Sequence, residues 1–517
     1  MIVEYLKDSV SRSVICRSAV SLMTRAGRGI ASAGRRSRIV QAVRPFFVRQ
    51  DLFLRMREES VLYGAAKWLF AWILAAVRLV YTAFSHLPPF SWLTTFADWL
   101  IRQKVSRVTA VLLAVILCVD DSRWNNGYGL LAALFVAALY LIQRTREAGE
   151  HHPALPASLF LLMFSCALAV FMGSFVSEAM RVFTYFLTAF LFMVVLAGSV
   201  RSLRDIREVL LILYGALIFV SVYAILQAVG GVAVNTSYTD VSTNPNTSGR
   251  VYATLINPNN FAEVLVLLMP CCFAAIWTEE RITRSAKLLL WAAFALPVLA
   301  LVLTLSRSAW ISFALSVGSF IALSNLWLVP PCLILLILAI PFLPASIMNR
   351  ILSLFSGTDT SVGYRVYIWE GAGDALRENW ISGVGLGTNN FYDAYRRFML
   401  DEAKVATHAH NLYFELWLEL GILGFLSGVT LMLSTLKNTL VSVFTDLAEQ
   451  KYLAIGLFSA LFGLLFMELV EYIWFYPRVM LVFWSILGLA WAMLRVVQSK
   501  HLASVRRDQV SGDPEKE

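Results

Sequence analysis

Charged residues are scarce in this chain of 517 residues: 15% are Asp, Glu, Lys or Arg, whereas 58% are hydrophobic. A soluble protein of this length needs far more polar surface, so the composition excludes an ordinary globular enzyme and indicates apolar side chains that face lipid. Cysteine is also rare. The six cysteines form no Cys-x-x-Cys pair, and all except Cys16 lie in apolar segments, which favours small helix residues over a metal or redox centre.

Apolar stretches of about twenty residues recur along the chain, and each is long enough to cross a hydrocarbon core. They predict an all-α integral membrane protein with about twelve transmembrane helices. The predicted spans are 105–119, 128–142, 157–173, 179–199, 208–229, 258–278, 286–304, 308–325, 327–343, 410–436, 452–473 and 477–497.

The basic connections between these spans all fall on one side of the predicted alternation. The connections carry Arg144 and Arg146, then Arg201, Arg204 and Arg207, then Arg281, Arg284 and Lys287, then Lys437 and Lys451, and finally the segment 500–507. Positively charged connections stay in the cytoplasm, so one orientation with both termini cytoplasmic satisfies all of them. Residues 1–60 hold twelve Lys and Arg against five acids. Such a segment can bind nucleic acid, but in a polytopic protein we expect contact with anionic membrane lipids and no nucleic acid.

The pattern divides the chain into six regions. Residues 1–61 are a basic cytoplasmic region, and 62–104 are a re-entrant hairpin or an interfacial helix pair, because one extra crossing would move the basic N-terminus outside. Residues 105–343 are a helix bundle, 344–409 a large extracytoplasmic loop, 410–497 the last transmembrane helices and 498–517 a cytoplasmic tail. Residues 230–257 form another outer loop, the first one along the chain. The glycine-rich stretch 383–387 follows no strand and is interpreted as a flexible turn, not a dinucleotide motif.

Three arginines lie at the outer ends of the spans, against the usual charge rule. Arg250 ends the first outer loop, Arg307 lies in a very short turn between two helices, and Arg365 lies early in the large loop. Arginine at a helix end often reaches toward lipid headgroups, which is the alternative interpretation for each of them. Three on one side favour an anionic ligand, because guanidinium groups bind phosphate oxygens through two parallel hydrogen bonds.

Histidines and acids occur at the same outer level. His408 and His410 form a His-x-His pair before the span 410–436, and a metal site is one alternative, but no third ligand is apparent. An imidazole here suits a general base acting on a hydroxyl group. Glu263 and Glu415 are candidate supporting residues. Glu419, Glu468 and Glu471 lie nearby, and helix–helix hydrogen bonding or pairing with arginine is the expected role of Glu419 and Glu468.

At this point the sequence resembles a known family. His410 and Asn411, nine further residues, and then Gly421-Ile422-Leu423-Gly424 resemble the signature of O-antigen ligases and the related Wzy-type polymerases. Gly249-Arg250 before Asn257-Pro258-Asn259, the turn Leu305–Ser308, and Arg365 with Trp369 resemble further segments of that family. The basic N-terminus and residues 62–101 have no counterpart in the resemblance.

The resemblance implies a GT-C-type glycosyltransferase of the plasma (inner) membrane, with its active site on the extracytoplasmic face. Such an enzyme moves a glycan from a polyprenyl (undecaprenyl) diphosphate carrier to an acceptor hydroxyl on a glycan, lipid or protein, without metal or other cofactor. Carried over by motif, His410 is the catalytic base, and Arg250, Arg307 and Arg365 bind the diphosphate. His408, Asn411, Glu263 and Glu415 are supporting residues.

Two other classes fit the hydropathy. A transporter or flippase also has about a dozen helices, but it predicts internal repeats and broken helices at mid-membrane, and no convincing repeat is found. A lipid-binding scaffold is the third class. The polar residues gather at the outer surface and favour surface chemistry. The acceptor, the sugars and the oligomeric state are not encoded in any motif.

Overall fold

The computed structural model describes residues 61–147, 155–233, 249–325, 329–339, 348, 360–444 and 448–511. These residues form helices and turns and contain no strand. Ten of the helical segments are long and apolar enough to cross a membrane. The chain is therefore an all-α integral membrane protein, as the composition predicts.

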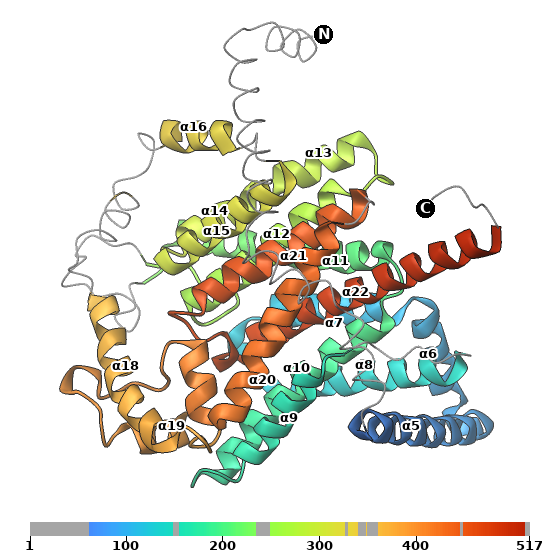
Figure 1. The fold of residues 1–517 in the computed structure, drawn as a ribbon. Helices are drawn as coiled ribbons and strands as arrows, with labels where there is room; N and C mark the ends of the chain where they lie inside the picture. The colour runs from blue at the N-terminus through green and yellow to red at the C-terminus, as the bar shows by residue number, and fades with distance from the viewer. Residues whose placement is uncertain are drawn as a thin grey trace, which may run out of the picture. The chain divides into compact units, whose positions relative to one another are not determined.

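The described helices follow one another along the chain as Figure 1 shows. They are α5 (Val61–His86), α6 (Ser91–Arg102), α7 (Val105–Cys118), α8 (Asn126–Arg146), α9 (Ala157–Ala169), α10 (Val176–Ser199), α11 (Leu203–Gly230), α12 (Pro258–Trp277), α13 (Arg284–Ala293), α14 (Ala295–Leu303), α15 (Arg307–Ser324), α16 (Val329–Ala339), α18 (Thr360–Asn379), α19 (Thr388–Tyr395), α20 (Leu412–Val443), α21 (Ala448–Met467) and α22 (Pro477–Ser511). Short 3-10 turns are η1 (Pro88–Phe90), η2 (Asp121–Arg123), η5 (Asp401–Ala403) and η6 (Ile473–Phe475).

Every predicted span carries a helix, although the boundaries differ. The span predicted at 286–304 is two helices, α13 and α14, and the span predicted from 410 begins at Leu412. α7, α9 and α16 are shorter than the other spans. The number of membrane crossings therefore stays a prediction, as does the division into six regions.

The chain forms two compact units, Met1–Ala76 and Val77–Glu517. In the first, residues 1–60 lie outside the described residues, and the start of α5 exposes Trp68 and Trp72 with ring centroids 6.0 Å apart. In the second, Asp98 of α6 binds Tyr81 and Arg146. Two helices, α5 and α6, thus cover the segment predicted as a re-entrant hairpin or helix pair, and α5 is long and apolar enough to span.

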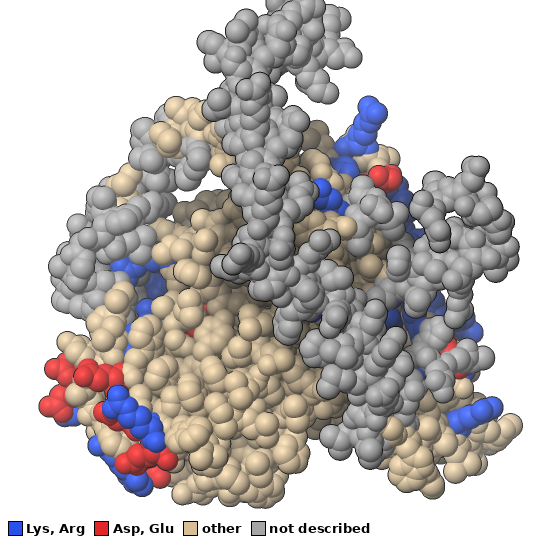
Figure 2. All heavy atoms as spheres, viewed as in Figure 1, with Lys and Arg blue, Asp and Glu red and all other residues tan. Residues whose placement is uncertain are grey.

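The core of the second unit surrounds α12, which is buried along nearly its whole length. Apolar residues occupy all sides of this helix, as expected for a helix that other helices enclose. It packs against α11, α15 and α21, while α22 packs on α10 and α20 packs on α9 and α21. Figure 2 shows few charged residues over α9, α10 and α20, whereas acids and bases gather over α18 and α19. The uncharged face fits contact with lipid.

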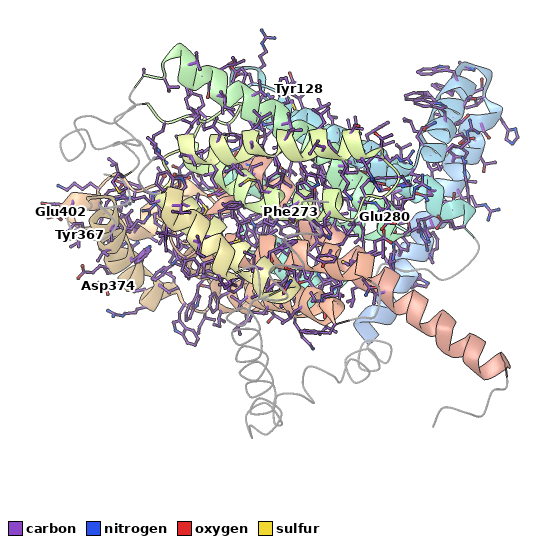
Figure 3. All side chains as sticks on the ribbon, turned by 90° about the horizontal axis from the view of Figure 1, so that it is seen from above. Tyr128, Phe273, Glu280, Tyr367, Asp374 and Glu402 are labelled. Carbon is purple, nitrogen blue, oxygen red and sulfur yellow. The ribbon has the colours of Figure 1, made fainter. Side chains whose placement is uncertain are left out.

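Polar residues gather at two separate ends of this unit. Figure 3 shows Tyr367, Asp374 and Glu402 together at one end and Glu280 well away from them, with Phe273 of α12 in between. The end near Glu280 collects the connections whose basic residues predicted a cytoplasmic position. There Arg207 binds Glu279 and Glu449.

The opposite end collects the connections predicted to lie outside. Arg478 at the start of α22 binds the carbonyl oxygens of Val119 and Thr254 and the carboxylate of Asp121. Three connections separated widely in sequence thus meet there. The alternation predicted from basic residues agrees with this arrangement, and the side of the membrane that each end faces stays a prediction.

The glycine-rich stretch 383–387 differs from its predicted role. It is buried, not an exposed flexible turn, and Gly383, Gly385 and Gly387 have φ angles of 72°, 94° and 100°. Its backbone bonds α20: the N–H of Val384 donates to the carbonyl of Leu418 at 2.8 Å, and that of Gly385 donates to Glu419 at 3.1 Å. Positive φ and close backbone contact both require glycine, so this segment is a fixed brace between the outer loop and α20.

Gly421 explains the glycine of the sequence signature. It interrupts α20 with φ 66° and ψ −171°, and a Cβ atom there would lie 2.2 Å from the carbonyl oxygen of Ile381. The glycine therefore opens α20 to receive the segment 381–383, in addition to the helix packing expected from the sequence.

Candidate active site

The polar end opposite Glu280 brings together residues from five places in the chain. They are Arg250 with the first turn of α12, the start of α15, Arg365 of α18, the segment 408–411 before α20, and the segment 468–475 after α21. Most of these segments flank the end of a helix, where backbone groups are not all used within the helix, whereas Arg250 lies in a loop and Arg365 within α18. Side chains at these termini converge without interrupting the apolar spans.

Glu471 is the carboxylate on which three of these elements meet. Its Oε1 atom accepts hydrogen bonds from Nη2 of Arg365 at 2.7 Å, Nδ2 of Asn259 at 3.0 Å and Oγ of Ser308 at 3.5 Å. The residue is buried. A single oxygen thus links α12, α15 and α18, and this hub fixes the positions of the residues around it.

Arg250 lies beside this hub and is nine-tenths buried. Its Nη2 donates to Oδ1 of Asn259 at 2.5 Å, and its Nε donates to the carbonyl of Thr304 at 2.8 Å. Thr304 directly precedes the Leu305–Ser308 turn. Arg250 is therefore connected to Glu471 through Asn259 and to the Arg307 turn through Thr304.

Arg307 is the first residue of α15 and is also nine-tenths buried. The hydroxyl oxygens of Ser306 and Ser308, on either side of it, lie 3.2 Å apart, and Ser308 reaches Glu471. The short turn thus places the backbone of Arg307 at the same cluster as Arg250 and Arg365. The segments that carry the three predicted arginines therefore meet at one cluster, and their binding of a diphosphate stays a prediction.

His410 lies between α18 and α20, with its ring centroid 6.4 Å from that of Tyr364 and 4.1 Å from that of His408. The adjacent carbonyl of Ala409 accepts a hydrogen bond from Nε1 of Trp369 at 2.8 Å. Nδ1 of His410 and Nε of Arg365 have no hydrogen-bond partner among the described residues. Both atoms are buried, so the site contains two polar groups whose hydrogen-bonding capacity the described residues do not use.

His408 has a different environment from its neighbour. Its ring stacks on Phe475 at a centroid distance of 4.3 Å, and its Nδ1 lies 3.0 Å from Oγ1 of Thr407. Stacking and a local hydrogen bond hold this ring in place. The choice of His410 over His408 as the reactive residue stays a prediction.

Both imidazoles are neutral in the ligand-free protein. Burial, and then the positive charge of Arg365, lowers the pKa of His410 to about 3. Burial, with smaller contributions from His410 and Arg365, lowers the pKa of His408 well below its usual range. A neutral ring can accept a proton, but a base with so low a pKa holds it weakly.

Backbone strain marks the same segments. Among the described residues, four that are not glycine have a positive φ, and three of these belong to the site segments: Ala253, Leu305 and His410, with φ of 52°, 52° and 47°. Such residues cost free energy, and they persist where the surrounding structure imposes the conformation. Strained residues cluster at functional sites, which supports the assignment of this cluster as the active site.

The supporting residues chosen from the sequence have structural roles. Oδ1 of Asn411 caps α20 by accepting from the N–H of Phe414 at 3.0 Å, and its Nδ2 donates to the carbonyl of Leu469 at 2.8 Å. Oε2 of Glu415 accepts from the N–H of Ala409 at 2.5 Å. Both side chains hold the histidine segment, so Asn411 is occupied by the fold instead of facing a sugar or the His410 ring.

Two carboxylates lie below the hub. Glu263 is buried one helical turn after Asn259, and its Oε2 has no hydrogen-bond partner among the described residues. Glu419 accepts from the N–H of Gly387 at 2.8 Å and from the hydroxyl of Tyr472 at 2.9 Å. Glu419 therefore has the hydrogen-bonding role that the sequence predicts.

Sequence reasoning missed the central position of Glu471 and the role of Asn259. Asn259 was part of a motif, yet nothing in the sequence showed that its amide bridges Arg250 and Glu471. The sequence did offer one signal for Glu471. It is a carboxylate at the outer end of a predicted span, at the same level as the three arginines.

No curated protein matches the chain in a sequence comparison. The family model described as O-antigen ligase matches residues 292–428, a range that contains Arg307, Arg365, His408 and His410. The resemblance to this family is thereby confirmed over residues 292–428, and the motif at residues 249–259 lies outside the matched range.

Proposed function

We propose that this protein is a membrane glycosyltransferase that moves a glycan from a polyprenyl diphosphate carrier to an acceptor hydroxyl in the synthesis of a cell-surface polysaccharide. The observation that carries the proposal is the convergence of Arg250, Arg307 and Arg365 beside His410 at one end of the bundle. A cluster of cations next to a neutral imidazole suits a reaction in which a diphosphate leaves and a hydroxyl loses a proton.

The reaction needs only a few groups. The acceptor oxygen attacks the anomeric carbon, the bond between that carbon and the phosphate oxygen breaks, and the electron pair leaves with the polyprenyl diphosphate. The hydroxyl proton passes to an imidazole nitrogen of His410 and then to solvent. Because diphosphate is already a good leaving group, the reaction does not require the pair of carboxylic acids that hydrolysis of a plain glycosidic bond needs.

The arginines supply the electrostatic part of catalysis. They neutralise charge that develops on the diphosphate, and a partly buried site makes this interaction stronger than it would be in water. Glu471 now holds the Nη2 atom of Arg365. An incoming diphosphate competes with this carboxylate for the guanidinium group, so Glu471 keeps Arg365 oriented before the donor binds.

The bound donor also improves the base. Part of the low pKa of His410 comes from the positive charge of Arg365. A diphosphate on Arg365 offsets that charge and raises the pKa of His410 toward its usual range, where proton transfer is more effective. Donor binding and base strength are therefore coupled in this proposal.

The test is a transfer assay with the purified full-length protein in lipid nanodiscs. A synthetic polyprenyl-diphosphate glycan and a panel of acceptors are supplied, and products are identified by mass spectrometry. Transfer by the wild type and its loss in His410→Ala support the proposal. Release of free glycan without any acceptor product, or wild-type activity in His410→Ala, overturns it.

The competing function is transport or flipping of a lipid-linked substrate. It predicts movement of labelled substrate across vesicles without formation of a new glycosidic bond. The site lies at one end of the bundle near helix termini, which favours transfer over transport.

A further inference from the structure

A polar cavity lies at the same end of the bundle as His410 and outside the arginine cluster. It is partly open, has a volume of about 110 Å³ and is lined by residues of η2, the first turn of α12 and the start of α22. Its polar and aromatic lining consists of Asp121, Trp124, Asn126, Asn260, Tyr476 and Arg478. None of these residues has a role in the transfer step described above.

Asn260 connects the cavity to the active site and supplies a polar group without a partner. The residue is 5% exposed and lines the cavity, and its side-chain amide makes no hydrogen bond among the described residues. Its neighbour Asn259 bonds Glu471. Consecutive residues of a helix point about 100° apart, so the first turn of α12 presents one amide to the arginine cluster and the next to the cavity.

The wall of the cavity is held rigid by its own contacts. Nε1 of Trp124 donates to Oδ1 of Asn126 at 2.7 Å, and the guanidinium of Arg478 lies 5.4 Å from the Trp124 ring centroid. Arg478 also donates to Asp121 at 2.5 Å. The indole ring and the polar groups therefore stand in fixed positions, which lowers the cost of binding a ligand.

These contacts define the chemistry of the ligand. Arg478 and Asp121 neutralise each other, so the cavity does not select a charged ligand as the arginine cluster does. The flat indole offers an apolar surface, and the amide and carboxylate groups offer donors and acceptors at its edge. A neutral ring with many hydroxyl groups fits this combination, and the volume limits it to a group about the size of one sugar.

We infer that this cavity is a saccharide subsite that holds one sugar residue of the transferred or accepting glycan next to the reaction centre. The inference rests on the proposed function and adds the place in the structure where a sugar of the glycan binds. Tyr476, in the cavity wall, follows Phe475, which stacks on His408 beside His410. Tyr476 in the cavity wall is thus the chain neighbour of Phe475, which supports the segment that carries the catalytic histidine.

The experiment compares Trp124→Ala and Asn260→Ala with the wild type in the nanodisc transfer assay, varying donor and acceptor separately. Each variant is expected to raise one KM about tenfold, the effect of one lost ring contact or hydrogen bond, with kcat unchanged within about threefold. Trp380→Ala is the matched control, because this tryptophan is exposed and lies outside the cavity lining. Trp124→Phe keeps an aromatic ring and is the second variant should Trp124→Ala fold poorly.

Binding is measured separately from transfer. Mono- to trisaccharides released by mild acid from the cell's own surface polysaccharide are added to each protein, and saturation-transfer NMR detects the bound sugar. A raised donor KM assigns the subsite to the donor glycan, and a raised acceptor KM assigns it to the acceptor. Unchanged KM values and unchanged sugar binding in both variants overturn the subsite while leaving transfer intact. If the wild type binds the sugar but shows no transfer, and Trp124→Ala abolishes that binding, the subsite is supported and the proposed function is overturned.

Discussion

The two polar ends of the bundle contain the same kinds of residues in different arrangements. At the end near Glu280, arginines face carboxylates directly: Arg207 bonds Glu279 and Glu449, and Arg107 bonds Glu208. At the other end, Arg250 bonds an amide and a backbone carbonyl, and Arg365 shares the oxygen of Glu471 with Asn259 and Ser308.

The difference separates structural charge from functional charge. Paired arginines at the first end neutralise buried acids, and they fasten helices to one another. At the second end, an amide and a backbone carbonyl orient Arg250, and Arg365 lies near the neutral ring of His410. The second arrangement suits an anionic ligand, and the first does not.

The largest expected difference between the ends is their accessibility. We expect Arg377→Cys, in exposed α18, to react with a membrane-impermeant maleimide in right-side-out spheroplasts, and Glu280→Cys to stay unlabelled until the membrane is permeabilised. Both changes are made in a cysteine-free background. The physical reason is that basic connections remain in the cytoplasm. Labelling of Glu280→Cys in intact spheroplasts would contradict the orientation.

The next largest expected effect is on catalysis at the end of the bundle that contains His410. His410→Ala should lower kcat of glycan transfer by about 10²- to 10⁴-fold, the usual contribution of a general base. Expression and thermal stability in detergent should remain near the wild-type values, because Nδ1 of His410 has no hydrogen-bond partner among the described residues. His408→Ala is the neighbouring control and should have a smaller effect. Equal losses in both variants would show that the pair acts through structure.

An arginine exchange at each end tests the comparison directly. Arg307→Lys should lower kcat/KM by about 10- to 100-fold, because lysine keeps the charge but cannot form two parallel bonds to phosphate oxygens. Arg281→Lys is matched to it at the other end, where Arg281 pairs with Glu279 near the surface, and it should remain within about twofold of the wild type. Near-full activity of Arg307→Lys at normal expression would remove Arg307 from the diphosphate site.

The contact between the brace, residues 383–387, and α20 should affect the stability of the protein more than its catalytic rate. Gly421→Ala places a Cβ 2.2 Å from the carbonyl oxygen of Ile381 at a φ and ψ that only glycine adopts readily. We expect a loss of about 1–3 kcal/mol in stability, read as a lower Tm in detergent. Gly318→Ala in α15 meets no atom within 4 Å and is the control. An unchanged Tm in Gly421→Ala would show that the loop can move away from α20.

Much of this arrangement could be predicted from the sequence, and the remainder could not for definable reasons. Apolar runs located the helices, and the basic connections predicted which helix ends meet. The position of Arg250, Arg307, Arg365 and His410 at one end followed from that alternation. The hub at Glu471 depends on which side chains touch across helices far apart in the sequence, and no local spacing encodes such a contact. Residues 383–387 were misread because a run of glycines suits both a flexible turn and a buried brace, and only its contacts with α20 decide between them.

The smallest expected effect is a shift in the pH dependence of the site. His410 acts in its neutral form, and the neutral fraction falls as the pH drops through the pKa. Because burial and Arg365 lower that pKa to about 3 in the free protein, kcat/KM should show no acid limb near the usual histidine value of about 6.5. In kcat, which reports the donor complex, the limb should lie at higher pH, because the bound diphosphate offsets the charge of Arg365. Arg365→Gln removes the lesser of the two causes, so the pKa of His410 should rise while burial still keeps it below its usual value. An NMR titration of the labelled His410 ring in nanodiscs, with His408→Gln to simplify the spectrum, measures the shift. A free-protein pKa near 6.5, or no change with Arg365→Gln, would show that the two residues are not electrostatically coupled.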